Sequence, residues 1–169
     1  LVIADDGLDW ATCILRHFLL AHLDRLRFAR LCESADEDLA VRARRLQAEM
    51  GVHVEHLDEW IRRLGAAGAA ARARLAAAAA RLASEVDMLF EEVDGQETIE
   101  ADGSYPGSTQ QMIAAWNEAT SAALTEAGVA ISAAAVSADC HGCRPRRLCA
   151  PLARHLVEMG QARREAPRA

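Results

Sequence analysis

Apolar residues recur every three or four positions along most of the chain, which is the spacing of a buried face on an α-helix. The first run predicts a helix over residues 8–32. Ser34, Asp36 and Glu37 follow in an arrangement typical of a capping box that opens a second helix, and Gly65 and Gly68 end it. The regular steps of this second helix predict packing into an antiparallel bundle. The expected buried positions are Ala11, Ile14, Leu15, Phe18, Leu19, His22, Leu26 and Ala29 in the first helix, and Leu39, Ala43, Leu46, Met50, His53, Leu57, Trp60 or Ile61, and Leu64 in the second.

The remainder of the chain continues in the same helical period. We expect a third helix over residues 69–92, a polar loop over residues 94–107 and a fourth helix that Ser108 caps and that runs to about residue 126. Residues 128–139 are predicted to be irregular, and a short last helix covers about residues 152–163. Because alternating β-branched and aromatic runs are missing, the sequence predicts an all-α fold with one helical-bundle domain over residues 1–164 and a frayed tail over residues 165–169. This fourth helix carries the apolar residues Met112, Ile113, Trp116, Ala119 and Leu124.

Charge and composition exclude several classes of protein. The 169 residues carry a formal net charge of -6, and all 19 basic residues are arginine, so binding of nucleic acid is disfavoured as the main function. No apolar run reaches the roughly 18 residues that span a bilayer, and the start of the sequence is acidic where a signal peptide is basic. The five cysteines are an odd number without an export signal, so we expect reduced thiols in a cytoplasmic protein.

Glu49, His53 and His56 form the first candidate for chemistry, because steps of four and three place them on one face of the second helix. Helical bundles bind two metal ions with a Glu from each of two helices and a Glu-x-x-His pair from each of two others. Here the Glu and His are four positions apart and no second pair exists. We therefore favour a structural Glu–His hydrogen bond, and expect no catalytic, cofactor-binding or metal-binding residue in this chain.

A second candidate is a cysteine cluster near the end of the chain. Two thiolates two residues apart fit one turn of a zinc knuckle, but the second pair of this cluster is loosely spaced. Free thiols are the simpler interpretation, and Arg144, Arg146, Arg147 and Arg154 nearby are interpreted as a solvated basic face. The zinc candidates are Cys140, Cys143, Cys149 and His155. The sequence has no glycine-rich phosphate loop and no arrangement for nucleophilic catalysis.

The end of the second predicted helix carries a more informative motif, Glu49-x3-His53-x6-Trp60-x2-Arg63-Leu64-Gly65. This motif resembles the phenylacetate-degradation family, and specifically the C subunit of ring-1,2-phenylacetyl-CoA epoxidase. Further similarities follow in order over nearly the whole chain: residues 1–18, Glu33 to Asp36, Leu89-Phe90, Ala115-Trp116-Asn117-Glu118 and Glu158-Met159.

The resemblance implies a ferritin-like antiparallel helical bundle in a multicomponent bacterial monooxygenase. In that family a catalytic A subunit holds a di-iron centre and epoxidises the ring of phenylacetyl-CoA, a reductase delivers electrons from NADPH, and the C subunit is a structural partner without a complete metal site. The resemblance thus implies that this chain holds no cofactor and meets phenylacetyl-CoA only through the complex. The sequence departs from the family in lacking the N-terminal helices, so we expect a fragment or a shortened homologue, and in replacing a His-Thr-Glu-His-Leu-Gly stretch at residues 148–153.

A bundle without some of its helices leaves apolar side chains uncovered, and each is worth about 1.5–3 kcal/mol when buried. We therefore expect Phe18, Leu19 and Leu26 to meet another chain, either a second copy or the catalytic epoxidase subunit. Two other functions stay open: a self-contained ferritin-like di-metal oxidase, and a zinc-stabilised helical interaction module.

Overall fold

The computed structural model describes residues 9–92 and 95–134, and these residues form helices joined by short connections. The helices, in chain order, are α1 (Trp10–Leu31), α2 (Glu37–Ala66), α3 (Ala69–Ala83), the 3₁₀ helix η1 (Val86–Phe90), α4 (Gln96–Ala101) and α5 (Thr109–Glu126). The described part of the chain contains no strand, so the expected all-α fold is confirmed. The predicted last helix and the tail at residues 165–169 lie outside the described residues.

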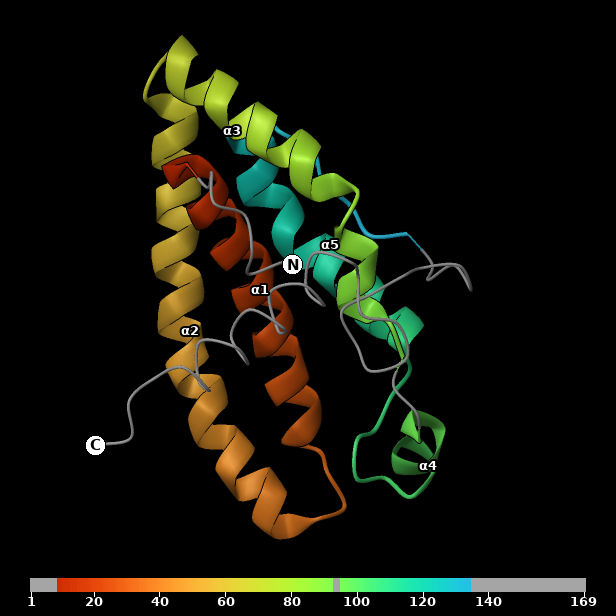
Figure 1. Cartoon of the computed structure of the whole chain (residues 1–169). Coiled ribbons are helices and arrows are strands. Elements are labelled where there is room, and N and C mark those ends of the chain that lie inside the picture. The colour runs from red at the N-terminus through yellow and green to blue at the C-terminus, as the bar shows by residue number, and fades with distance from the viewer. Residues whose placement is uncertain (1–8, 93–94, 135–169) are drawn as a thin grey trace, which may run out of the picture.

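Helix α1 is the centre of the bundle. Figure 1 shows α1 and α2 side by side and running in opposite directions, with α3 crossing near the end of α2 and α5 on the other side of α1. Because α1 contacts α2, α3 and α5, its apolar positions are covered from several directions, and burial of such side chains drives folding. The largest fully buried side chains of the core are Leu15, Phe18, Leu19, Leu23, Ile61, Leu75, Trp116 and Leu124.

This arrangement corrects one expectation about the surface. Phe18 and Leu19 are both 0% exposed in the core of this chain, so they do not offer a face to another protein. Leu26 is half-buried against the same core. The sequence pattern correctly identified an apolar face, but α3 and α5 already cover most of it.

The buried face of α2 is rotated slightly from the predicted one. Its buried residues are Ala40, Ala43, Val54, Ile61 and Gly65. The predicted positions Leu46 and His53 are exposed instead. A helical period of three and four residues fits two adjacent faces almost equally well, and the neighbouring helices decide which one is buried.

Two glycines shape the connection between α2 and α3. Gly68 has a φ of +100° and precedes the first residue of α3, a conformation that glycine adopts without strain. Helix α2 ends at Ala66, within the stretch from Gly65 to Gly68 that was expected to end it. A side chain at position 65 would place its Cβ 2.5 Å from the Cα of Ala127, so this glycine allows the ends of α2 and α5 to touch.

The middle of the chain contains more turns than the sequence pattern suggests. The predicted helix over residues 69–92 ends at Ala83, and η1 follows it with Val86, Leu89 and Phe90 buried. The predicted polar loop contains the short helix α4. The spacing of Val86, Leu89 and Phe90 would suit one face of a continued α-helix equally well, so the hydrophobic pattern alone does not reveal the break after Ala83.

Side-chain caps fix where the long helices begin. The Asp9 carboxylate caps α1 by accepting from the Thr12 backbone N–H at 2.8 Å, and this hydrogen bond lowers the pKa of Asp9 from its usual 3.8. Ser108 and Gln111 form a capping box at α5, as the Ser108 cap predicted. At α2 the cap is Asp36, which accepts from the Leu39 N–H at 3.1 Å, and not a box that begins at Ser34.

The cap of α2 leads to a first prediction. Asp36→Ala should lower the free energy of unfolding by about 1 kcal/mol, because it removes the acceptor for an unpaired N–H group. Asp38→Ala removes the same charge from the first turn of the same helix without removing a cap, and should cost only about 0.3 kcal/mol. Urea denaturation followed by circular dichroism measures both, and equal losses would mean that Asp36 contributes only its charge.

Candidate functional site

The predicted imidazoles of α2 line an open groove of about 440 Å³ between α1 and α2. His53 and His56 come from α2, and His17 and Asp24 come from the facing helix α1. The rest of the lining is apolar and consists of Leu20, Ala21, Met50 and Leu57. The structure thus brings two of the three candidate residues of α2 to one surface groove.

Glu49 does not join them. Its side chain is exposed, and its Oε1 accepts from Nε of Arg45 at 3.3 Å, so the expected Glu49–His53 hydrogen bond is not formed. The Nε2 atom of His56 lies 3.0 Å from Nε1 of Trp60, which donates to it. The Glu49 carboxylate is therefore paired with Arg45, and Nε2 of His56 already accepts a hydrogen bond from Trp60.

A di-iron centre needs several carboxylates and imidazoles that converge on one point. Within residues 9–92 and 95–134, no group of three or more His, Cys, Asp or Glu side chains is arranged to hold a metal ion. The donor set of the described residues therefore does not fit such a centre. The zinc candidates Cys140, Cys143, Cys149 and His155, and the arginines at positions 144, 146, 147 and 154, lie outside the described residues.

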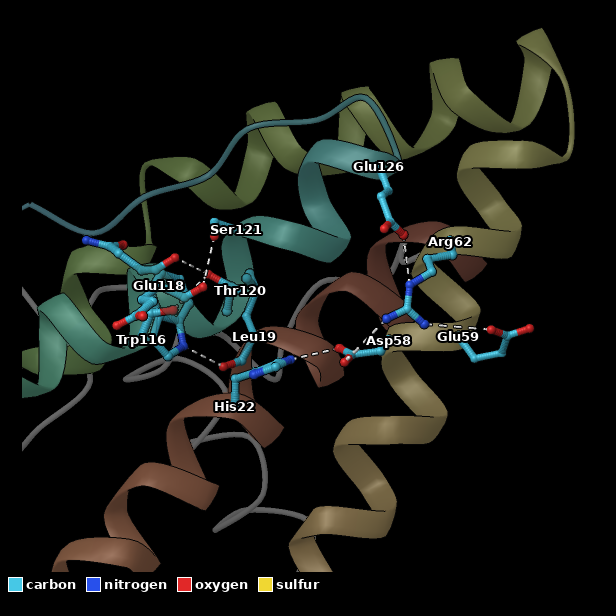
Figure 2. A network of polar contacts seen from close by, with 11 residues as sticks. Leu19, His22, Asp58, Glu59, Arg62, Trp116, Glu118, Thr120, Ser121 and Glu126 are labelled. Carbon is cyan, nitrogen blue, oxygen red and sulfur yellow. Dashed lines mark hydrogen bonds and ion pairs between the residues drawn. The ribbon is translucent and has the colours of Figure 1, made fainter.

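The acid–imidazole pair that the structure does form joins α1 to α2. Nε2 of His22 lies 2.9 Å from Oδ1 of Asp58, and the His22 side chain is only 4% exposed. Figure 2 shows that this pair belongs to a network of polar contacts that continues from Asp58 through Arg62 to Glu126. The other Asp58 oxygen lies 3.9 Å from Arg62, whose Nε lies 2.9 Å from the Glu126 carboxylate at the end of α5.

This network connects three helices, because His22 belongs to α1, Asp58 and Arg62 to α2 and Glu126 to α5. A hydrogen bond to a buried imidazole fixes the position of one helix along another, since sliding would leave the imidazole unpaired. The arrangement is suited to holding the bundle together. His22 was expected on the buried face, but its partner Asp58 was not predicted from the sequence. The sequence signal for Asp58 is its position directly after Leu57, a residue expected to be buried.

The sequence profile of the phenylacetic acid catabolic protein family matches residues 1–164. The chain belongs to this family. No curated protein matches the chain. The family is ferritin-like, in agreement with the helical bundle described above, and membership assigns this protein a role in the catabolism of phenylacetic acid.

The motif by which the sequence resembles the phenylacetic acid catabolic family makes structural contacts in this member. The Trp60 ring packs edge-on against Trp10 with centroids 5.8 Å apart, and the Arg63 guanidinium lies 5.8 Å from the Trp60 centroid. Gly65 ends the motif at its contact with Ala127. The second half of the motif therefore packs the end of α2 against its neighbours.

No helix among the described residues of this family member is both long enough and apolar enough to cross a membrane.

Asn117, which belongs to the Ala115-Trp116-Asn117-Glu118 part of the resemblance, holds the segment after α5. Its side chain donates to the Ala133 carbonyl at 2.9 Å and accepts from the Ala133 N–H at 2.8 Å. This pair of bonds mimics a strand contact and fixes the chain as far as the described residues extend.

Proposed function

We propose that this chain is the non-catalytic partner subunit of a multicomponent phenylacetyl-CoA epoxidase, in which a different subunit carries the di-iron centre. Family membership supports the pathway. The observation that carries the structural role is the placement of Glu49, which is exposed and bonded to Arg45 instead of facing His53 and His56. A catalytic subunit would need that carboxylate beside the imidazoles.

The surface of α2 supports a role in assembly. Val41 and Val52 are 55% and 68% exposed and lie on the outward side of this helix. Leu46, which is 42% exposed, lies instead on the row of Met50, His53 and Leu57 that borders the groove. Exposed apolar groups of this size favour burial against another protein. In the proposed complex the catalytic subunit covers the outward side of α2 that Val41 and Val52 form, phenylacetyl-CoA binds to the complex through that subunit, and the assembly works in the cytoplasm.

Co-expression with the di-iron member of the same family from the same genome tests this proposal. We expect the two chains to purify together, with iron in the complex and none in stoichiometric amount in this chain alone. Val52→Asp should weaken the complex at least about tenfold, because it places a charge in an apolar interface. Ile99→Asp makes the same kind of change at an exposed apolar residue of α4 and should leave the affinity unchanged.

Elemental analysis of the separate chain distinguishes the other functions. About two iron ions per chain, lost in Glu49→Ala or His53→Ala, would mean a self-contained di-metal oxidase. About one zinc ion per chain, lost when Cys140 or Cys143 is replaced, would mean a zinc-stabilised interaction module. Either result, or failure of the two chains to associate, would contradict the proposal.

A further inference from the structure

The groove between α1 and α2 is part of a longer apolar face that these two helices share. All described residues that line the groove belong to α1 or α2, so no other element of the described part of the chain reaches into it. On α2 the face carries Met50, Leu57 and Leu64, which are half-buried, and His53, which is exposed. The regular steps of α2 predict that these positions are buried, yet a single chain leaves them partly open to solvent.

Helix α1 contributes a row of side chains to the same face. His17, Leu20 and Asp24 line the groove. Steps of four residues extend the row to Cys13 at one end and to Phe28 at the other, both half-buried. His17 is exposed, and the Asp24 side chain is 41% exposed. Because a free cysteine packs as a small apolar residue, the row is apolar at its centre and at both ends, with one polar residue between.

This row is complementary to itself when it is turned end to end. The midpoint of α1 lies directly after Leu20. His17 and Asp24 are equally far from that midpoint, and so are Cys13 and Phe28. A two-fold axis through the midpoint therefore places His17 of each copy opposite Asp24 of the other. The same axis places Cys13 opposite Phe28, and each contact occurs twice, as in any two-fold interface.

We propose that the α1–α2 face binds a second copy of this chain, with the two α1 helices antiparallel, so that two α1–α2 pairs form one four-helix bundle. Helix α1 has 22 residues, which span about 33 Å, and two adjacent helices are about 20 Å wide. The face thus offers about 650 Å² per copy, or about 1,300 Å² in total, which lies within the range of roughly 1,200–2,000 Å² for stable interfaces.

The polar groups select the antiparallel arrangement. Parallel α1 helices would bring the two Asp24 carboxylates together, whereas antiparallel helices give each carboxylate an imidazole N–H. Oδ1 of Asp24 already lies 3.3 Å from Nη1 of Arg27, but a carboxylate accepts several hydrogen bonds, so this contact leaves room for a second donor. Such pairs set the orientation of the two copies, and the apolar positions supply most of the affinity.

The α1–α2 face is separate from the outward side of α2 that Val41 and Val52 form. One chain can therefore bind a second copy and a catalytic subunit at the same time, and the inference does not depend on the proposed assembly. Val52→Asp keeps the two tests apart, because it should weaken only the complex with the catalytic subunit and leave self-association unchanged.

Sedimentation equilibrium of the full chain tests the inference, and we expect a reversible dimer. His17→Glu and Asp24→Arg should each weaken this dimer at least about tenfold, since each change spoils two contacts per dimer. Glu55→Arg makes the same charge change as Asp24→Arg at an exposed residue of α2 outside the groove, and should have no effect. Circular dichroism shows whether each variant is folded.

A mixture of the two weakened variants gives the most specific result. We expect it to associate about as tightly as the original chain. In the mixed dimer, the new carboxylate at position 17 meets the new guanidinium at position 24, and the other contact keeps His17 opposite Asp24. Only an antiparallel pair of α1 helices predicts this recovery.

Phe28→Cys provides an independent measurement. Position 28 is about 22 Å from Cys13 along α1, so a disulfide between them cannot form within one chain. Across the proposed dimer the two positions face each other. Mild oxidation should therefore give a linked dimer on a non-reducing gel, and Cys13→Ser in the same background should abolish it.

Three results would overturn the inference. One is a chain that stays monomeric up to millimolar concentration, which would mean that something other than a second copy covers the face. Another is a mixture of His17→Glu and Asp24→Arg that associates no more tightly than either variant alone. The third is a failure of Phe28→Cys to link two chains through Cys13.

Discussion

Trp116→Ala is expected to lower the free energy of unfolding by about 3–5 kcal/mol, the range for removal of a large aromatic side chain from a core. Trp116 is 0% exposed, packs against Phe90 with centroids 5.5 Å apart and donates from Nε1 to the Leu19 carbonyl at 3.0 Å. The substitution therefore removes a packing centre and a link between α5 and α1. Because a domain has only about 5–15 kcal/mol of net stability, the variant should be close to unfolding.

Urea denaturation followed by circular dichroism measures this loss. Trp10→Ala is the matched control, because Trp10 is 61% exposed and makes one edge-on contact with Trp60. That aromatic contact is worth about 0.5–1.5 kcal/mol, so the control should lose no more than this. Trp116→Phe should fall between the two. Equal losses for Trp116→Ala and Trp10→Ala would mean that α5 does not pack on α1 as described.

Asp58→Ala should lower the free energy of unfolding by about 1–3 kcal/mol, because it leaves the buried His22 imidazole without its partner. The two side chains are 2.9 Å apart across the α1–α2 interface. Glu59→Ala is the matched control on the same helix. Within the described residues Glu59 pairs only with Arg62 and Arg63, and it is 50% exposed, so Glu59→Ala should lower the free energy of unfolding by at most about 1 kcal/mol.

A double variant sharpens this test. Replacing His22 by Leu in the Asp58→Ala background removes both partners, and the free energy of unfolding should recover toward that of the original protein. If the double variant is instead less stable by the sum of the two single losses, His22 and Asp58 do not act as a pair.

Much of the fold follows from local sequence signals. The predicted helix over residues 8–32 corresponds to Trp10–Leu31, and the helix that Ser108 caps corresponds to Thr109–Glu126. A helical period and a capping side chain act within a few residues, so they can be recognised in the sequence. The end of α3 at Ala83 could not be recognised in this way. The burial of Val86, Leu89 and Phe90 in η1 depends on helices that are far away in the chain.

The candidate site shows the same division. The spacing of His53 and His56 placed them correctly on one face of α2, and they do line one groove. The partners of these polar side chains could not be predicted from the sequence. Glu49 pairs with Arg45 on its own helix, and His22 pairs with Asp58, which is 36 positions away.

The contact between Gly65 and Ala127 has a consequence for how this sequence can change over time. With 2.5 Å between a hypothetical Cβ and the Ala127 backbone, position 65 admits no side chain unless the end of α5 moves away. Homologues that carry alanine or serine there should therefore show compensating changes around position 127, such as a longer turn after α5. Related sequences that carry a side chain at position 65 but keep the chain around position 127 unchanged would be the exception. In those proteins we expect the ends of α2 and α5 to lie further apart.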